Sequence, residues 1–167
     1  MFGHNTNGVG SGCKAWPRDR SSFRPATEPT GVAVESTSPI RVLLADDHVV
    51  VRQGLVRLLQ DQADIEVVGE ATDGNEAVDL CRQVRPDVVI MDVNMPKANG
   101  LDATRQIASE APEIRIIALT VYKSPDMEGL LLGAGAWAYL PKDGPFSVLI
   151  DRIRGHRGAS KSDRLHP

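Results

Sequence analysis

Short, mostly apolar runs alternate with amphipathic stretches five times between residues 40 and 153. Runs of four to six mostly apolar residues are typical of strands buried on both faces of a sheet. The stretches between them repeat their apolar residues at helical spacing. The pattern predicts strands at 40–45, 65–69, 88–91, 114–119 and 136–140, each followed by a helix, with the last helix over 146–153.

Strict alternation of strand and helix indicates an α/β fold with a parallel sheet and right-handed crossovers. We therefore expect a doubly wound, five-stranded parallel sheet with helices on both faces. In open sheets of this kind, ligands bind beyond the carboxyl ends of the strands. That edge is the place to look for chemistry.

The ends of the chain differ from its body. About half of the first 39 residues are Gly, Pro, Ser, Thr or Asn, without any period, so we expect residues 1–38 to form a disordered extension. Residues 39–155 make the domain, and residues 156–167 form a short basic tail. Between residues 40 and 150, 17 acidic residues outnumber 10 basic ones, which disfavours direct contact with nucleic acid.

The sequence offers no sign of a membrane or secretory context. No apolar run approaches the roughly 18–20 residues of a membrane helix, and no signal-peptide pattern precedes the domain. The two cysteines, Cys13 and Cys81, make neither a disulfide framework nor a metal cluster. A cytoplasmic protein without a membrane partner is therefore expected.

Polar residues stand at the carboxyl ends of four predicted strands. Asp46 and Asp47 follow the first strand, Asp92 ends the third, Thr120 ends the fourth, and Lys142 follows the fifth. Each residue alone has an ordinary explanation, such as a helix cap for Asp47 or a surface position for Lys142. Their joint placement at one predicted edge favours a site.

Three carboxylates so close together need a counter-charge. Two unit charges 4 Å apart repel by about 4 kcal/mol at an effective dielectric constant near 20. Lys142 supplies one positive charge, and the oxygen donors favour Mg²⁺ as the cofactor that supplies the rest. Such a site suits phosphoryl transfer, with one carboxylate attacking phosphorus and Thr120 donating a hydrogen bond.

Several motifs of residues 39–155 resemble the receiver domain of bacterial two-component response regulators, which has a flavodoxin-like (βα)5 fold. The D-x-x-M-P-x-x-x-G stretch from Asp92 to Gly100 is highly specific, and the opening D-D-H followed by V-R-Q-G-L is most similar to the NarL/FixJ subgroup. The fragments that carry the resemblance are LLADDH (43–48), VRQGLVRLL (51–59), DVVIMDVNMPKANGLDATRQI (87–107), IIALT (116–120) and AYLPKD (138–143).

The resemblance implies a role for each site residue. Asp92 is expected to be the phosphoacceptor, and Lys142 to contact the phosphoryl group. Asp46 and Asp47 are expected to bind Mg²⁺ together with Asp92 and the backbone carbonyl of Asn94. Thr120 and Tyr139 are expected to form the switch pair that reports phosphorylation.

The resemblance also implies a phosphorylation-dependent signalling switch. A sensor histidine kinase or phosphotransfer protein would supply the phosphoryl group, and a downstream protein target or a homodimer partner would read the change. Such a domain catalyses its own phosphorylation and dephosphorylation, and it is not an enzyme in the substrate-turnover sense.

Two alternatives differ in class. NarL/FixJ regulators usually continue into a LuxR-type helix-turn-helix domain, and the chain ends at Pro167 without room for one. It is therefore expected to be a stand-alone receiver, or a fragment or truncated form of a DNA-binding transcriptional regulator. A Mg²⁺-dependent phosphohydrolase is disfavoured, because such enzymes usually carry D-x-D and a cap insertion, whereas Asp46 and Asp47 are adjacent.

Two further features leave alternatives open. Gly129 and Gly133 lie in a predicted helix that begins at Ser124, where they either weaken the helix or permit close packing. If they weaken it, we expect phosphorylation to stiffen residues 124–135. Trp137 is either an exposed anchor for a partner or half-buried under a neighbouring helix.

Overall fold

The computed structural model describes residues 38–95, 100–121 and 124–157. The predicted N-terminal extension lies outside the described residues, except for Ser38, and so does the tail beyond Arg157. Residues 96–99, in the middle of the motif that begins at Asp92, are also outside.

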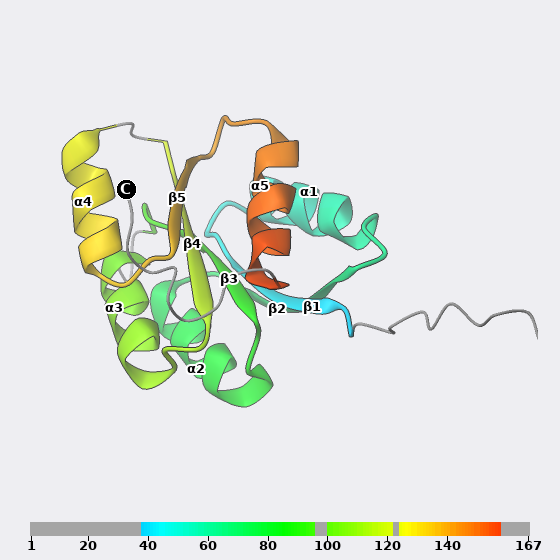
Figure 1. Cartoon of the computed structure of the whole chain (residues 1–167), viewed down its shortest axis with the longest axis horizontal. Coiled ribbons are helices and arrows are strands. Elements are labelled where there is room, and N and C mark those ends of the chain that lie inside the picture. Colours follow the sequence, from blue (N-terminus) through cyan, green and yellow to red (C-terminus); the bar gives the residue numbers. More distant parts are fainter. Residues whose placement is uncertain (1–37, 96–99, 122–123, 158–167) are drawn as a thin grey trace, which may run out of the picture. The chain divides into compact units, whose positions relative to one another are not determined.

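Five parallel strands form one sheet in the order β2-β1-β3-β4-β5, with a helix after each strand (Figure 1). This arrangement confirms the predicted doubly wound fold. The strands are β1 (Ile40–Ala45), β2 (Ile65–Ala71), β3 (Val88–Asp92), β4 (Arg115–Thr120) and β5 (Ala138–Pro141). The helices are α1 (Val49–Gln60), α2 (Gly74–Val84), α3 (Gly100–Glu110), α4 (Pro125–Gly133) and α5 (Phe146–Arg154), followed by the 3-10 turn Gly155–Arg157.

Alternate residues of each strand enter different hydrophobic layers. Leu44 of β1 belongs to a cluster with Leu59 of α1 and Ile150 of α5. The preceding Leu43 belongs to the opposite cluster, which includes Cys81 of α2 and residues of α3. Helices α1 and α5 thus cover one face of the sheet, and α2 and α3 cover the other.

Helix termini follow their local chemistry. Ser124 caps α4 by accepting a hydrogen bond from the Met127 amide, and Pro125 occupies the first helical position, as the sequence predicts. Helix α2 ends at Val84, and the next residue, Arg85, caps it with a left-handed φ of 44°, immediately before Pro86. The chain therefore leaves α2 abruptly and enters β3.

Trp137 is half-buried, so the expectation of an exposed anchor is wrong and the alternative is confirmed. Strand β5 begins only at Ala138, so the in-and-out alternation of a strand does not apply to Trp137. Its ring packs on the α1–α5 side of the core and lies close to Gly155 at the end of α5. The Arg115 guanidinium lies over the ring, 4.6 Å from its centre, in a cation–π contact.

Helix α4 has a thin attachment to the core. Leu131 is its one fully buried residue, and it packs against Ala118 and Val93. Leu130 and Leu132 are exposed. A Cβ built on Gly129 or Gly133 would meet nothing within 4 Å, so close packing does not explain the two glycines.

Replacing Gly129 by Ala is expected to raise the free energy of unfolding by about 0.5–1 kcal/mol. The reason is that the methyl group enters open space in a helix interior while the unfolded chain loses freedom. Chemical denaturation of both proteins measures the difference. An unchanged or lower stability would show that the glycine has a packing or conformational role in the folded state.

Candidate functional site

Four strand ends bring the predicted site residues to one edge of the sheet. Strand β3 lies between β1 and β4, so Asp92 at its end is flanked by Asp46 after β1 and Thr120 at the end of β4. Lys142 follows β5, and its amide donates to the carbonyl of Thr120 over 2.8 Å. That backbone bond holds the lysine loop against the neighbouring strand.

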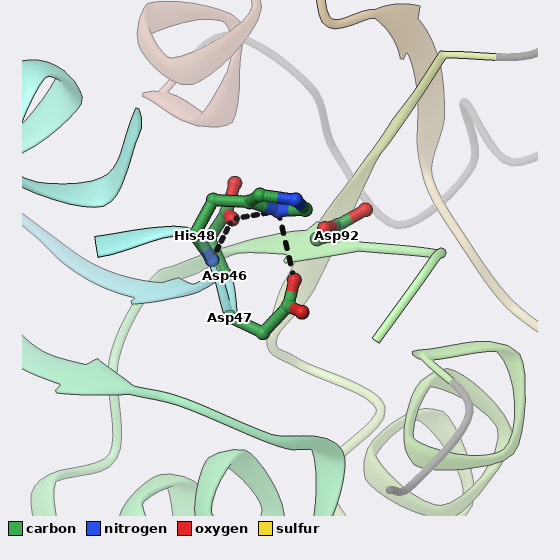
Figure 2. Close-up of side chains that lie close together, drawn as sticks. All are labelled: Asp46, Asp47, His48 and Asp92. Carbon is green, nitrogen blue, oxygen red and sulfur yellow. Dashed lines mark hydrogen bonds and ion pairs between the residues drawn. The ribbon is translucent and has the colours of Figure 1, made fainter. Parts of the chain in front are cut away.

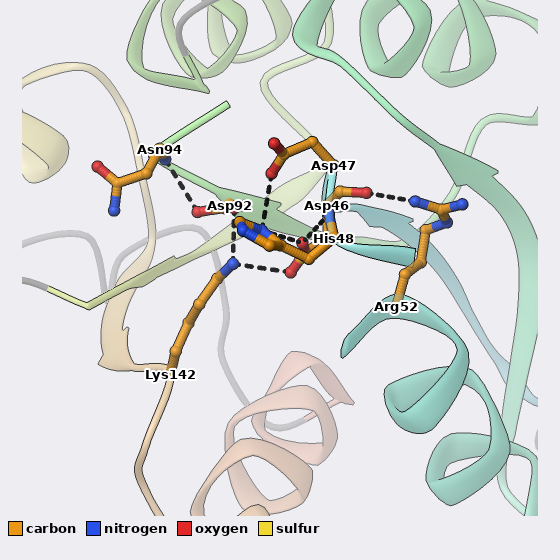
Figure 3. A network of polar contacts seen from close by, with 7 residues as sticks. All are labelled: Asp46, Asp47, His48, Arg52, Asp92, Asn94 and Lys142. Carbon is orange, nitrogen blue, oxygen red and sulfur yellow. Dashed lines mark hydrogen bonds and ion pairs between the residues drawn. The ribbon is translucent and has the colours of Figure 1, made fainter. Parts of the chain in front are cut away.

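Lys142 joins two carboxylates through its ammonium group (Figure 3). Its Nζ lies 2.6 Å from Asp92 Oδ2 and 2.9 Å from Asp46 Oδ2, and its side chain is only 12% exposed. Burial alone would lower the pKa of Lys142, but the hydrogen bond to Asp92 and the negative charges of Asp92 and Asp46 outweigh it, and the pKa is raised. Lys142 is therefore a fixed positive charge at neutral pH.

The two carboxylates that face Lys142 are almost fully buried, with Asp46 and Asp92 each 1% exposed. Backbone amides orient them from the other side. The Asn94 amide donates to Asp92 Oδ1 over 2.9 Å, and the His48 amide donates to Asp46 Oδ1 over 2.8 Å. Buried carboxylates require such partners.

The donor set fits a divalent cation. Donor atoms of Asp46, Asp47, His48 and Asp92 all lie within 4.8 Å of one another (Figure 2). Asp46 Oδ2 and Asp47 Oδ1 are buried and accept no hydrogen bond of good geometry, although Lys142 and His48 lie at ion-pair distance. Among the described residues, the ammonium group of Lys142 pairs with Asp46 and Asp92 while Asp47 adds a third carboxylate, so the cluster keeps an excess of negative charge, and its oxygen donors suit Mg²⁺.

The predicted switch residues lie on adjacent strands. Thr120 is fully buried at the end of β4, and Tyr139 of β5 stands opposite Ala118. The half-buried Tyr139 packs against the cluster that Leu131 of α4 forms with Val93 and Ala118. The ring therefore connects the site edge to α4, and the coupled movement of Thr120 and Tyr139 stays a prediction.

Arg52 belongs to the site, although the sequence analysis did not identify it. Its Nη1 donates to the backbone carbonyl of Asp46 over 2.6 Å, and its Nε pairs with Glu70 of β2 at 3.2 Å. The side chain is only 11% exposed. The sequence shows an arginine on the first turn of a helix that follows an acidic pair. This position does not reveal that its hydrogen-bond acceptor is a backbone carbonyl.

Gly100 explains the end of the D-x-x-M-P-x-x-x-G motif. A Cβ on this residue would overlap the carbonyl oxygen of Asp92 and lie 2.9 Å from Cα of Val93. Contacts that close to rigid backbone atoms cannot be relieved by a rotamer change. The glycine therefore lets the start of α3 approach the backbone of Asp92.

The family model for the response regulator receiver domain matches residues 42–154. The fold and this match define a receiver domain, and the chain belongs to the response regulator receiver family. Receiver domains are signalling switches of two-component systems.

Individual relatives agree with this assignment. The response regulator GacA of Pseudomonas viridiflava is 42% identical over 115 residues, which cover 69% of this chain and 54% of GacA. The transcriptional regulatory protein LiaR of Bacillus subtilis is 44% identical over 124 residues, which cover 74% of this chain and 57% of LiaR. The chain thus spans little more than half the length of these relatives.

Solved structures show the same fold. The receiver domain of the NarL response regulator from Mycobacterium tuberculosis superposes with a TM-score of 0.66 and 30% identity, covering 71% of this chain and 98% of that one. A LuxR-family response regulator from Aurantimonas sp. gives a TM-score of 0.69 and 34% identity, covering 76% of this chain and 93% of that one. Across residues 38–157, apart from the two short gaps, no helix has the length and apolar character to span a membrane.

Removing the Arg52 side chain is expected to weaken Mg²⁺ binding about tenfold, because the loop that carries Asp46 and Asp47 loses its anchor. Isothermal titration calorimetry with Mg²⁺ on Arg52→Ala measures this. Arg57→Ala, an exposed arginine of the same helix, is the control and should bind as the wild type does. Lower thermal stability with unchanged Mg²⁺ affinity would assign Arg52 to the fold alone.

Gly100→Ala is expected to destabilise the domain by about 1–3 kcal/mol, because the methyl group meets the backbone at Asp92 and Val93. Gly54→Ala is the matched control, since a Cβ there meets nothing within 4 Å. Denaturant titration of the three proteins gives the comparison. Equal stability of the two variants would refute the steric argument.

Proposed function

We propose that this chain is a phosphorylation-dependent switch in which Asp92 accepts a phosphoryl group from a histidine kinase or phosphotransfer protein. The observation that carries the proposal is the placement of Lys142 Nζ between the buried carboxylates of Asp92 and Asp46. A buried nucleophile beside a fixed cation is suited to an acceptor whose product gains negative charge.

The reaction follows from the chemistry of the groups. An oxygen of the Asp92 carboxylate attacks phosphorus, the bond from phosphorus to the donor's imidazole nitrogen breaks, and the imidazole leaves with the electron pair. The product is an acyl phosphate on Asp92. Lys142 then turns from the carboxylate pair to the phosphoryl oxygens, because they carry the larger negative charge.

The remaining site residues have supporting roles. When bound by Asp46, Asp47, Asp92 and the carbonyl of Asn94, Mg²⁺ would supply positive charge to the phosphoryl oxygens. Asp46 and Asp47 provide carboxylate oxygens for the cation at the carboxyl edge of the sheet. The Thr120 hydroxyl donates to the phosphoryl group, and the Tyr139 ring follows it inward.

The output is a change of the surface around α4, which a protein partner or a second copy of the chain reads. The low helix propensity of α4 and the exposed Leu130 and Leu132 support this choice of surface. The same site catalyses phosphorylation from small phosphodonors and hydrolysis of its own acyl phosphate. Membership in a longer transcriptional regulator is a second candidate, favoured by the match to about half of LiaR.

Incubation with Mg²⁺ and acetyl phosphate or phosphoramidate, followed by intact mass spectrometry, tests the acceptor. The wild type is expected to gain one base-labile group of about 80 Da, because one acyl phosphate forms. Asp92→Asn should gain none, while Asp102→Asn, an exposed carboxylate of α3, should behave as the wild type does. A folded wild type without any gain, or an equal gain in Asp92→Asn, would overturn the assignment.

A further inference from the structure

His48 places an imidazole nitrogen among the carboxylates of the site. Its Nδ1 lies 2.9 Å from Asp47 Oδ1 and 3.4 Å from Asp46 Oδ1 (Figure 2). The backbone amide of the same residue is fixed by Asp46 Oδ1, so the ring is held at the mouth of the site. The side chain is 63% exposed, which leaves the ring accessible from solvent.

The spacing of these donors matches neighbouring positions in octahedral coordination. Metal bonds of about 2.1 Å at right angles place neighbouring donor atoms about 3 Å apart. The separations of 2.9 and 3.4 Å from Nδ1 to the two carboxylates bracket that value. A cation held by Asp46 and Asp47 therefore has the imidazole within reach without a large movement of the loop.

We propose that His48 is an additional metal ligand, which gives this site a preference for first-row transition ions over Mg²⁺. The inference rests on the proposed function, because it assumes that the acidic pair binds a divalent cation. Carboxylates serve Mg²⁺ and transition ions alike, whereas imidazole favours Zn²⁺, Ni²⁺ and Cu²⁺. His48 thus adds affinity for the second group of ions and little for Mg²⁺.

A consequence for signalling follows from the coordination positions. An imidazole that occupies one position next to the carboxylates leaves fewer positions for phosphoryl oxygens and water. A transition ion held through His48 therefore competes with the Mg²⁺ form of the switch. The availability of such ions would set the fraction of protein that is ready to receive a phosphoryl group.

The competing explanation is a simple hydrogen bond. In that case Nδ1–H donates to Asp47 Oδ1, and His48 orients the carboxylate without touching the cation. Removing the ring would then change Mg²⁺ and Ni²⁺ binding by the same factor. The two explanations differ in metal selectivity.

Calorimetric titration of the full chain with Ni²⁺ and with Mg²⁺ distinguishes them. His48→Gln is expected to weaken Ni²⁺ binding about tenfold or more and to change Mg²⁺ binding less than twofold. His156→Gln is the matched control, because His156 lies beside Asp87 at the other end of the sheet. Pulsed electron paramagnetic resonance of bound Mn²⁺ should show a directly coordinated nitrogen in the wild type and none in His48→Gln.

The sequence contains four histidines, so Ni²⁺ bound elsewhere must be separated from Ni²⁺ at the site. Competition provides the separation, since Mg²⁺ displaces only the ions that share its site. Equal Ni²⁺ affinity of the wild type and His48→Gln at the Mg²⁺-competed site overturns the inference while the proposed function stands. A wild type that binds no Mg²⁺, or an Asp47→Asn variant that binds it equally well, overturns the proposed metal site itself.

Discussion

Mutual repulsion among three carboxylates is the constraint around which this end of the molecule is built. Asp46 and Asp92 are buried beside each other, and the ammonium group of Lys142 reaches both. Fifty residues separate Lys142 from Asp92 in the chain. Their contact depends on β4 lying between β3 and β5, and on the backbone bond that holds the lysine loop to Thr120. The strand order thus brings the Lys142 ammonium next to the two carboxylates, where it offsets their repulsion.

The sequence was sufficient to predict the sheet, its parallel direction and the edge that carries the site. Strands that are buried on both faces consist mainly of apolar residues, which makes them recognisable in the sequence. Parallel pairing then puts their carboxyl ends together. Strand limits were less accurate, because pairing decides them: β2 runs on to Ala71 beside β1, and β5 begins only at Ala138. Because β5 begins after Trp137, the alternation of a strand did not predict that Trp137 is half-buried.

Contacts made by long side chains could not be derived in the same way. Arg52 reaches a carbonyl rather than a carboxylate, and the identity of that acceptor depends on the turn between β1 and α1. The position of His48 similarly depends on the hydrogen bond that its backbone amide donates to Asp46 Oδ1. The need for glycine at position 100 becomes clear only from the close packing of the start of α3 on the backbone of Asp92. Each of these depends on distances between segments that no local pattern encodes.

The contact between Gly100 and the backbone of Asp92 has a mechanical consequence. Atoms in van der Waals contact resist further approach steeply, so the first turn of α3 cannot move toward β3. Buried Thr104 reinforces that turn by donating to the Gly100 carbonyl over 2.7 Å. Helix α3 is therefore packed rigidly against the backbone of Asp92. Under the proposed function, a displacement that begins at Asp92 would meet this rigid contact on the α3 side, whereas α4 buries only Leu131 and offers less resistance.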